Sequence, residues 1–128
     1  MKQLNKLTTI TLLATALLST NVFAEKDIPP MMKAALTCAP TIQYIINEAE
    51  PPTLSDYQML RGWTTELTNQ LMEATGESYS KSQLRANTFI RKASKELGKN
   101  LEWESYKGRI GSAWSGANKI YEMHCEDF

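Results

Sequence analysis

One stretch, PPMMKAALTCAPTIQYIINEAEPP at residues 29–52, sets the architecture expected of this chain. Its opening proline pair suits the first turn of a helix, where the missing backbone N–H of proline is not needed. Apolar residues then recur at helical spacing, and the closing proline pair ends the run. Pro40 lies inside the run, so we expect it to kink or restart the helix. The stretch predicts a first helix from about Pro30 to Ala49.

A second helix is predicted directly after the closing prolines. Thr53 and Asp56 have the spacing of a capping box, in which each side chain accepts a hydrogen bond from the other residue's backbone. Apolar residues, Trp63 among them, then follow at intervals of three and four. Gly76 is placed to end this helix in the left-handed conformation.

Two more helices are predicted in the C-terminal half. The third begins near Ser80 or Ser82 and ends just before Gly98, which is expected to terminate it. The fourth has Asn100 as its N-cap and reaches about His124. No strand alternation is found, so the sequence predicts an all-α protein.

The cysteines tie this architecture together. Cys38 and Cys125 are the only two, and an even pair in an exported protein is most simply one disulfide. Short connections favour an up-down-up-down four-helix bundle with a kinked first helix. In that topology the first helix begins where the fourth ends, so Cys38 faces Cys125. Closing a loop of about 87 residues stabilises the fold by roughly 4–5 kcal/mol in the chain-entropy model.

Residues 1–24 have the composition of a secretory signal peptide. Lys2 and Lys6 open the segment, an apolar stretch follows, and residues 22–24 suit the positions that a signal peptidase reads. We therefore expect a single mature domain, 25–128, located in the bacterial periplasm or exported beyond it.

Charge and hydropathy narrow the class of partner. Removing Lys2 and Lys6 from the 14 basic residues leaves 12 against 14 acidic residues, a net charge of −2 with the histidine neutral. A nucleic-acid-binding domain usually shows a basic excess. No second apolar stretch reaches the roughly 18 residues needed to span a bilayer. We expect neither a nucleic-acid partner nor an integral membrane segment.

Small residues recur in the predicted fourth helix, at Gly108, Ser112 and Gly116. Each glycine inside a helix costs roughly 0.8–1 kcal/mol relative to alanine, so the pattern calls for an explanation. Three are considered: close approach of another helix, a break around residues 108–111, or a shallow groove for a ligand. If the stripe faces outward, it is the best candidate for a docking surface.

The tryptophans divide into two kinds. Large aromatic residues at helical spacing are usually core, and we predict this for Trp63 and Trp114. Trp103 lies off the apolar stripe and between two glutamates. Such a residue could anchor a partner, because tryptophan is enriched at binding hot spots, or it could pack over the end of the bundle.

No catalytic motif is found. His124 is the only histidine, so a Ser-His-Asp or Cys-His arrangement could use no other. The C-terminal residues offer one histidine and two carboxylates beside a cysteine that is expected to be oxidised, which is a poor metal-ligand set. The sequence contains no glycine-rich phosphate loop, haem-attachment motif or nucleophile elbow. We expect no enzymatic activity, no metal and no cofactor.

These observations predict an exported, non-enzymatic, protein-binding module of inhibitor, immunity or envelope accessory type. Its partner is expected to be another exported or envelope protein, and no oligomeric state is predicted. Two alternatives remain: a small-ligand-binding bundle with apolar pockets near Pro40 and the glycines of the fourth helix, or a periplasmic stress chaperone. The predicted partner-binding residues are Trp103, Gly108, Ser112, Trp114 and Gly116.

Overall fold

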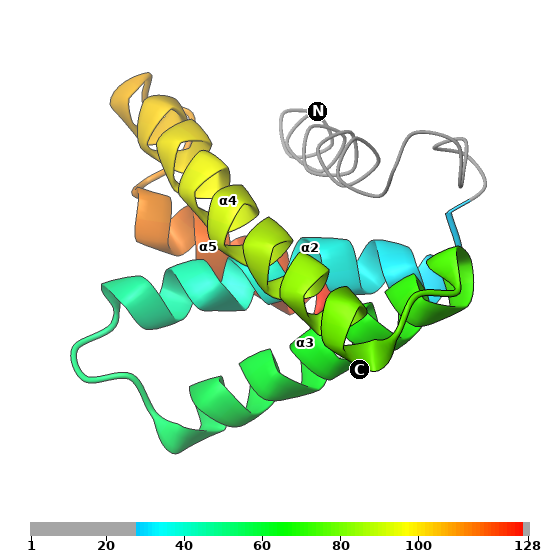
Figure 1. Ribbon diagram of the computed structural model, residues 1–128. Helices are drawn as coiled ribbons and strands as arrows, with labels where there is room; N and C mark the ends of the chain where they lie inside the picture. Colours follow the sequence, from blue (N-terminus) through cyan, green and yellow to red (C-terminus); the bar gives the residue numbers. More distant parts are fainter. Residues whose placement is uncertain (1–27, 127–128) are drawn as a thin grey trace.

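The computed structural model describes residues 28–126, and these residues form four α-helices (Figure 1). Successive helices reverse direction, which confirms the predicted all-α, up-down-up-down arrangement. The predicted signal peptide, residues 1–24, lies outside the described residues. The helices are α2 (Pro30–Glu48), α3 (Leu54–Thr75), α4 (Tyr79–Tyr106) and α5 (Ala113–His124).

Helix α2 is the central element of the fold. It contacts α3, α4 and α5, and every residue from Ala35 to Ile42 is buried. A helix that is buried on all sides needs a nearly continuous run of small or apolar residues, which this stretch supplies. Pro40 lies inside α2, where it cannot donate a backbone hydrogen bond to the carbonyl of Leu36, but it does not split the helix in two.

Helix α3 begins and ends as the sequence predicts. Thr53 Oγ1 accepts a hydrogen bond from the Asp56 N–H at 3.1 Å, and Asp56 Oδ2 accepts one from the Thr53 N–H at 3.1 Å, which completes the capping box. Gly76 ends the helix with a φ of 72°. Trp63 is only 3 % exposed, so its predicted place in the core is confirmed.

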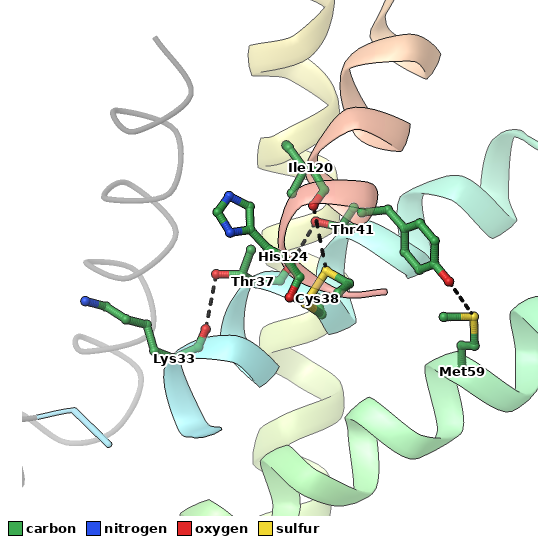
Figure 2. Close-up of a disulfide and its surroundings, with 9 residues drawn as sticks. Lys33, Thr37, Cys38, Thr41, Met59, Ile120 and His124 are labelled. Carbon is green, nitrogen blue, oxygen red and sulfur yellow. Dashed lines mark hydrogen bonds between the residues drawn. A yellow bond between two sulfur atoms is a disulfide. The ribbon is translucent and has the colours of Figure 1, made fainter. Parts of the chain in front are cut away.

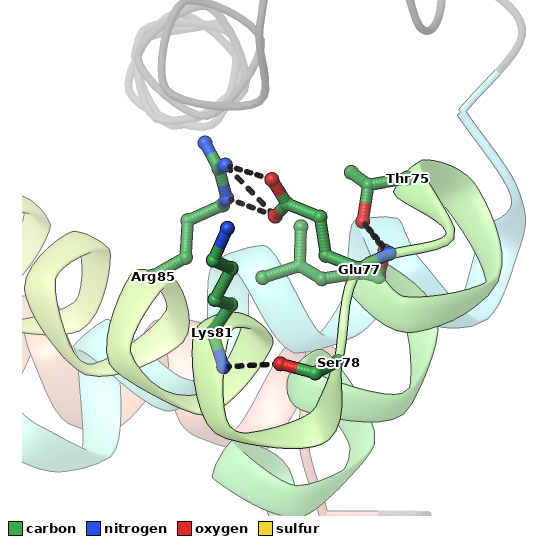
Figure 3. Close-up of polar contacts among 6 residues, drawn as sticks. Thr75, Glu77, Ser78, Lys81 and Arg85 are labelled. Atoms are coloured by element: carbon green, nitrogen blue, oxygen red, sulfur yellow. Dashed lines mark hydrogen bonds and ion pairs between the residues drawn. The ribbon is translucent and has the colours of Figure 1, made fainter.

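A short turn joins α3 to α4 (Figure 3). The Ser78 hydroxyl accepts a hydrogen bond from the Lys81 N–H at 3.2 Å, so Ser78 is the N-cap and α4 begins slightly earlier than predicted. Arg85 Nη2 donates to both carboxylate oxygens of Glu77, at 2.8 and 2.9 Å. This forked ion pair holds the turn against the first two turns of α4.

The end of α4 departs from the prediction. The helix does not end at Gly98, and Asn100 is not an N-cap, because α4 continues without interruption to Tyr106. The buried stripe explains this, since Leu97 and Leu101 lie one turn apart on either side of Gly98 and both pack into the core. Local termination signals at Gly98 and Asn100 are outweighed by this burial.

Gly108, ten residues later, is the glycine that ends α4. Its φ is 76°, its N–H donates to the Ser105 carbonyl at 2.9 Å, and the Arg109 N–H donates to the Glu104 carbonyl at 2.9 Å. These two bonds form a Schellman motif, which satisfies carbonyls that the helix leaves without partners. The predicted fourth helix is therefore wrong in extent, and a break explains Gly108.

Helix α5 begins after this break, with Ser112 as its N-cap. The Ser112 and Ser115 hydroxyls each accept a hydrogen bond from the other residue's backbone N–H at 3.0 Å. Gly116 is buried, and a Cβ built there would lie 2.9 Å from Leu101 Cδ2 and 2.8 Å from Ile110 Cδ1. Close packing therefore explains Gly116, and the three small residues do not form one helical stripe.

The predicted disulfide is confirmed, and it joins α2 to the residue that follows α5 (Figure 2). The Cα atoms of Cys38 and Cys125 are 5.6 Å apart, and both residues are fully enclosed by the core. Beside it, Tyr121 Oη donates to Met59 Sδ at 3.1 Å, which connects α5 to α3. The C-terminal helix is thus held to both α2 and α3.

Candidate functional site

Two large aromatic side chains are exposed at the C-terminal end of α4. Trp103 is 52 % exposed and Tyr106 is 82 % exposed, and their rings stack with centroids 5.7 Å apart and planes 20° apart. Lys107 Nζ lies 4.7 Å from the centroid of the Trp103 ring, within the range of a cation–π interaction. We call these three residues the aromatic surface.

The helix positions this surface by its own periodicity. Leu101 and Glu104 face the core, so Trp103 and Tyr106, which lie at other angles around the helix axis, face solvent. In Figure 1 this end of α4 extends away from α3, with α5 beside it. The aromatic surface therefore lies at one end of the molecule, next to the turn between α4 and α5.

An ion pair between a buried glutamate and an exposed arginine holds the end of α4 that carries the aromatic surface. The Glu104 side chain is 8 % exposed, and its Oε2 accepts a hydrogen bond from Arg109 Nη1 at 3.3 Å. A buried carboxylate needs a nearby cation or hydrogen-bond donors, because its desolvation is otherwise unfavourable. Since the backbones of these two residues also pair in the Schellman motif, the end of α4 is held in one geometry.

The remaining predicted binding residues are placed differently from one another. Trp114, in the first turn of α5, is 42 % exposed, so the prediction that it belongs to the core is wrong. The break before α5 changes the helical phase, and the buried face of α5 consists of Gly116, Ala117 and Ile120. Gly108 and Ser112 are exposed in the turn, whereas Gly116 is covered by Leu101 and Ile110 and is not open to a partner.

His124 is exposed at the C-terminal end of α5, next to the disulfide. Within residues 28–126, no three histidine, cysteine or acidic side chains come together as a metal ion would require. In the same part of the chain, no helix is both long enough and apolar enough to cross a membrane.

Two features of the surface were missed by the sequence reasoning. The stacking of Trp103 on Tyr106 could have been found, because residues three apart on a helix are neighbours on its surface. A cleft between α2 and α4, centred on Tyr44 and Gly98, was not predicted, since the sequence placed Gly98 at a helix end. This cleft does not coincide with the apolar pocket that the sequence predicted near Pro40, because Pro40 is not among its lining residues.

The fold and its surface define a class: a small all-α protein, closed by one disulfide, with a stacked aromatic pair exposed at one end. Comparison with models of known protein families yielded no match, and neither did comparison with curated proteins or with solved structures.

Proposed function

We propose that this chain is an exported, non-enzymatic helical module that binds another exported or envelope protein through the aromatic surface. The observation that carries the proposal is the exposure of Trp103 and Tyr106 as a stacked pair. Tryptophan and tyrosine are enriched at binding hot spots because each buries a large area with few rotatable bonds. The predicted signal peptide supports a partner in the same compartment.

The arrangement of the aromatic surface suits recognition by a protein. The Trp103 ring contacts both the Tyr106 ring and the Lys107 ammonium group, so it loses little rotamer freedom when a partner covers it. The backbone below it is fixed by the Glu104–Arg109 ion pair and, across the molecule, by the disulfide. We expect the partner to offer an apolar pocket for the indole ring.

The test is a comparison of two variants of the tagged, exported protein in capture from its native envelope. Trp103→Ala is expected to lose the partner that the unchanged protein captures. With the purified partner, the dissociation constant should rise about 30-fold, which corresponds to a hot-spot cost of about 2 kcal/mol. Tyr79→Ala is the matched control, because Tyr79 is an aromatic residue of the same helix, 45 % exposed, at the opposite end.

Both variants should unfold at nearly the same temperature as the unchanged protein, since each residue is about half-exposed to solvent and lies outside the core. Equal affinity of Trp103→Ala and the unchanged protein for the captured partner would refute the assignment of the aromatic surface. An equal loss of affinity in Trp103→Ala and Tyr79→Ala would also refute it, because the effect would then not depend on the end of α4 that carries the aromatic surface.

A further inference from the structure

A cleft of about 250 Å³ lies between the second half of α2 and the middle of α4. Three of its lining residues are buried, Tyr44 from α2 and Ser94 and Gly98 from α4. Exposed polar and charged side chains form its rim, Asn47 and Glu48 from α2 and Lys95, Lys99 and Glu102 from α4.

Gly98 keeps the base of this cleft open. A Cβ built at Gly98 would lie 3.0 Å from Cε1 and 3.2 Å from Cδ1 of Tyr44. A side chain at this position would therefore push the phenol ring outward into the cleft. The glycine lets the ring lie directly against the backbone of α4, and the hollow above it remains.

The rim of the cleft carries charges of both signs. Burial raises the pKa of Tyr44, and the carboxylates of Glu48 and Glu102, which line the same cleft, raise it further. Lys95 and Lys99 lie one turn apart on α4 and form the basic part of the rim. Within residues 28–126, none of these four charged side chains forms an ion pair, so all four are available to a ligand.

From this geometry we infer that the cleft is a binding site for a small zwitterion, an amino acid or dipeptide that carries both an ammonium and a carboxylate group. The ammonium group is placed between Glu48 and Glu102, above the ring of Tyr44, and the carboxylate is placed at Lys95 and Lys99. A simple cation or anion meets like charge at one part of the rim, whereas a zwitterion is attracted by both.

The size of the cleft limits the ligand. Pockets for drug-sized molecules usually enclose about 300–1,000 Å³, and this cleft lies just below that range. We therefore expect weak, millimolar binding of one small molecule rather than tight enclosure of a large one. The inference does not depend on the aromatic surface, which lies further along α4.

The test is an NMR titration of the oxidised protein with alanyl-alanine. Saturable shifts are expected at the amides of Gly98 and Lys99, with none at the amide of Tyr79 at the distant end of α4. N-acetyl-alanyl-alanine lacks the ammonium group and alanyl-alanine amide lacks the carboxylate, so each should bind at least about tenfold more weakly. Absence of saturable shifts at millimolar dipeptide, or equal binding of the three compounds, would overturn the inference.

Matched variants separate the cleft from the fold. Gly98→Ala should abolish the shifts, whereas Gly62→Ala, the same change at an exposed helical glycine with nothing within 4 Å of its Cβ, should leave them intact. Glu102→Gln alters only an exposed rim residue and should weaken binding about tenfold even if Gly98→Ala folds poorly. Binding by Glu102→Gln as strong as that of the unchanged protein would contradict the proposed site.

Discussion

At the scale of single residues, the helical glycines show that the same residue affects stability differently according to the atoms around it. Gly62 in α3 is exposed, and no atom lies within 4 Å of the place where its Cβ would be. Gly98 and Gly116 instead allow two helices to approach each other, against Tyr44 in one case and Leu101 in the other. The first glycine only lowers helix propensity, whereas the other two are required by packing.

The substitution Gly116→Leu tests this distinction. Because Leu101 and Ile110 already occupy the space around Gly116, the new side chain should lower the free energy of unfolding by about 1–3 kcal/mol. Gly62→Leu, the matched control, should raise it by up to about 0.8 kcal/mol through helix propensity. Urea unfolding followed by circular dichroism measures both changes, and a stabilising effect at Gly116 would contradict the packing described.

A second residue-scale prediction concerns Tyr44 at alkaline pH. Its pKa is raised from 10.0 in the folded protein, first by burial and then by Glu48 and Glu102. As pH rises above about 10, the unfolded chain loses the phenol proton first, so the folded state becomes less stable. Tyr44→Phe should make the loss of stability between about pH 10 and the raised pKa less steep.

The measurement is the free energy of unfolding in urea as a function of pH for the unchanged protein and for Tyr44→Phe. Tyr57→Phe is the control, because Tyr57 is a half-exposed tyrosine of α3. If the unchanged protein and Tyr44→Phe lose stability in parallel, the phenol group is not the source of the alkaline effect.

At the scale of elements, some helix boundaries are set by local sequence signals and others by tertiary packing. Both ends of α3 follow from local signals, the capping box at Thr53 and the left-handed Gly76. The boundary between α4 and α5 does not, because Gly98 and Gly108 look alike as candidates for helix termination. Burial of the leucines on either side of Gly98 keeps that residue helical and lets Tyr44 pack against it, and Gly108 adopts the positive φ instead.

The prediction at this scale is that Gly108→Ala destabilises the turn between α4 and α5. An alanine at a φ of 76° is strained, so the free energy of unfolding should fall by about 1 kcal/mol. Gly111→Ala is the control in the same turn, since its Cβ would meet only Ser115 Oγ at an ordinary 3.5 Å. Thermal unfolding of both variants provides the comparison, and an unchanged midpoint for Gly108→Ala would argue against the Schellman motif.

At the scale of the whole molecule, the disulfide joins Cys38 in the enclosed helix α2 to Cys125, 87 residues later in the chain. The chain-entropy model assigns about 4–5 kcal/mol to a loop of this length, a large share of the roughly 5–15 kcal/mol typical of a whole domain. Reduction, or the paired change Cys38→Ala and Cys125→Ala, should therefore lower the melting temperature substantially. Scanning calorimetry with and without reductant measures this, and equal melting temperatures would show that the bond contributes little.

The sequence predicted most of the helices, the disulfide and part of the core, but little of the surface. The signals for α2 and α3, the disulfide pairing and the burial of Trp63 were readable because each rests on local pattern or on a count of cysteines. Trp114 was assigned to the core because an unbroken helix was assumed, and the break at Gly108 changes the phase of everything after it. The cleft at Tyr44 joins residues from two helices, and no local pattern encodes that contact.

By itself, the sequence determined that the chain is all-α, that four helices alternate in direction and that Cys38 pairs with Cys125. Helix periodicity and capping can be identified within short stretches of sequence, and two cysteines allow only one intramolecular disulfide. Only the tertiary structure decided which glycine ends α4, which tryptophans face solvent and where a cleft lies. These depend on which side chains meet between helices, and a packing contact worth a few kcal/mol outweighs a local preference of about 1 kcal/mol.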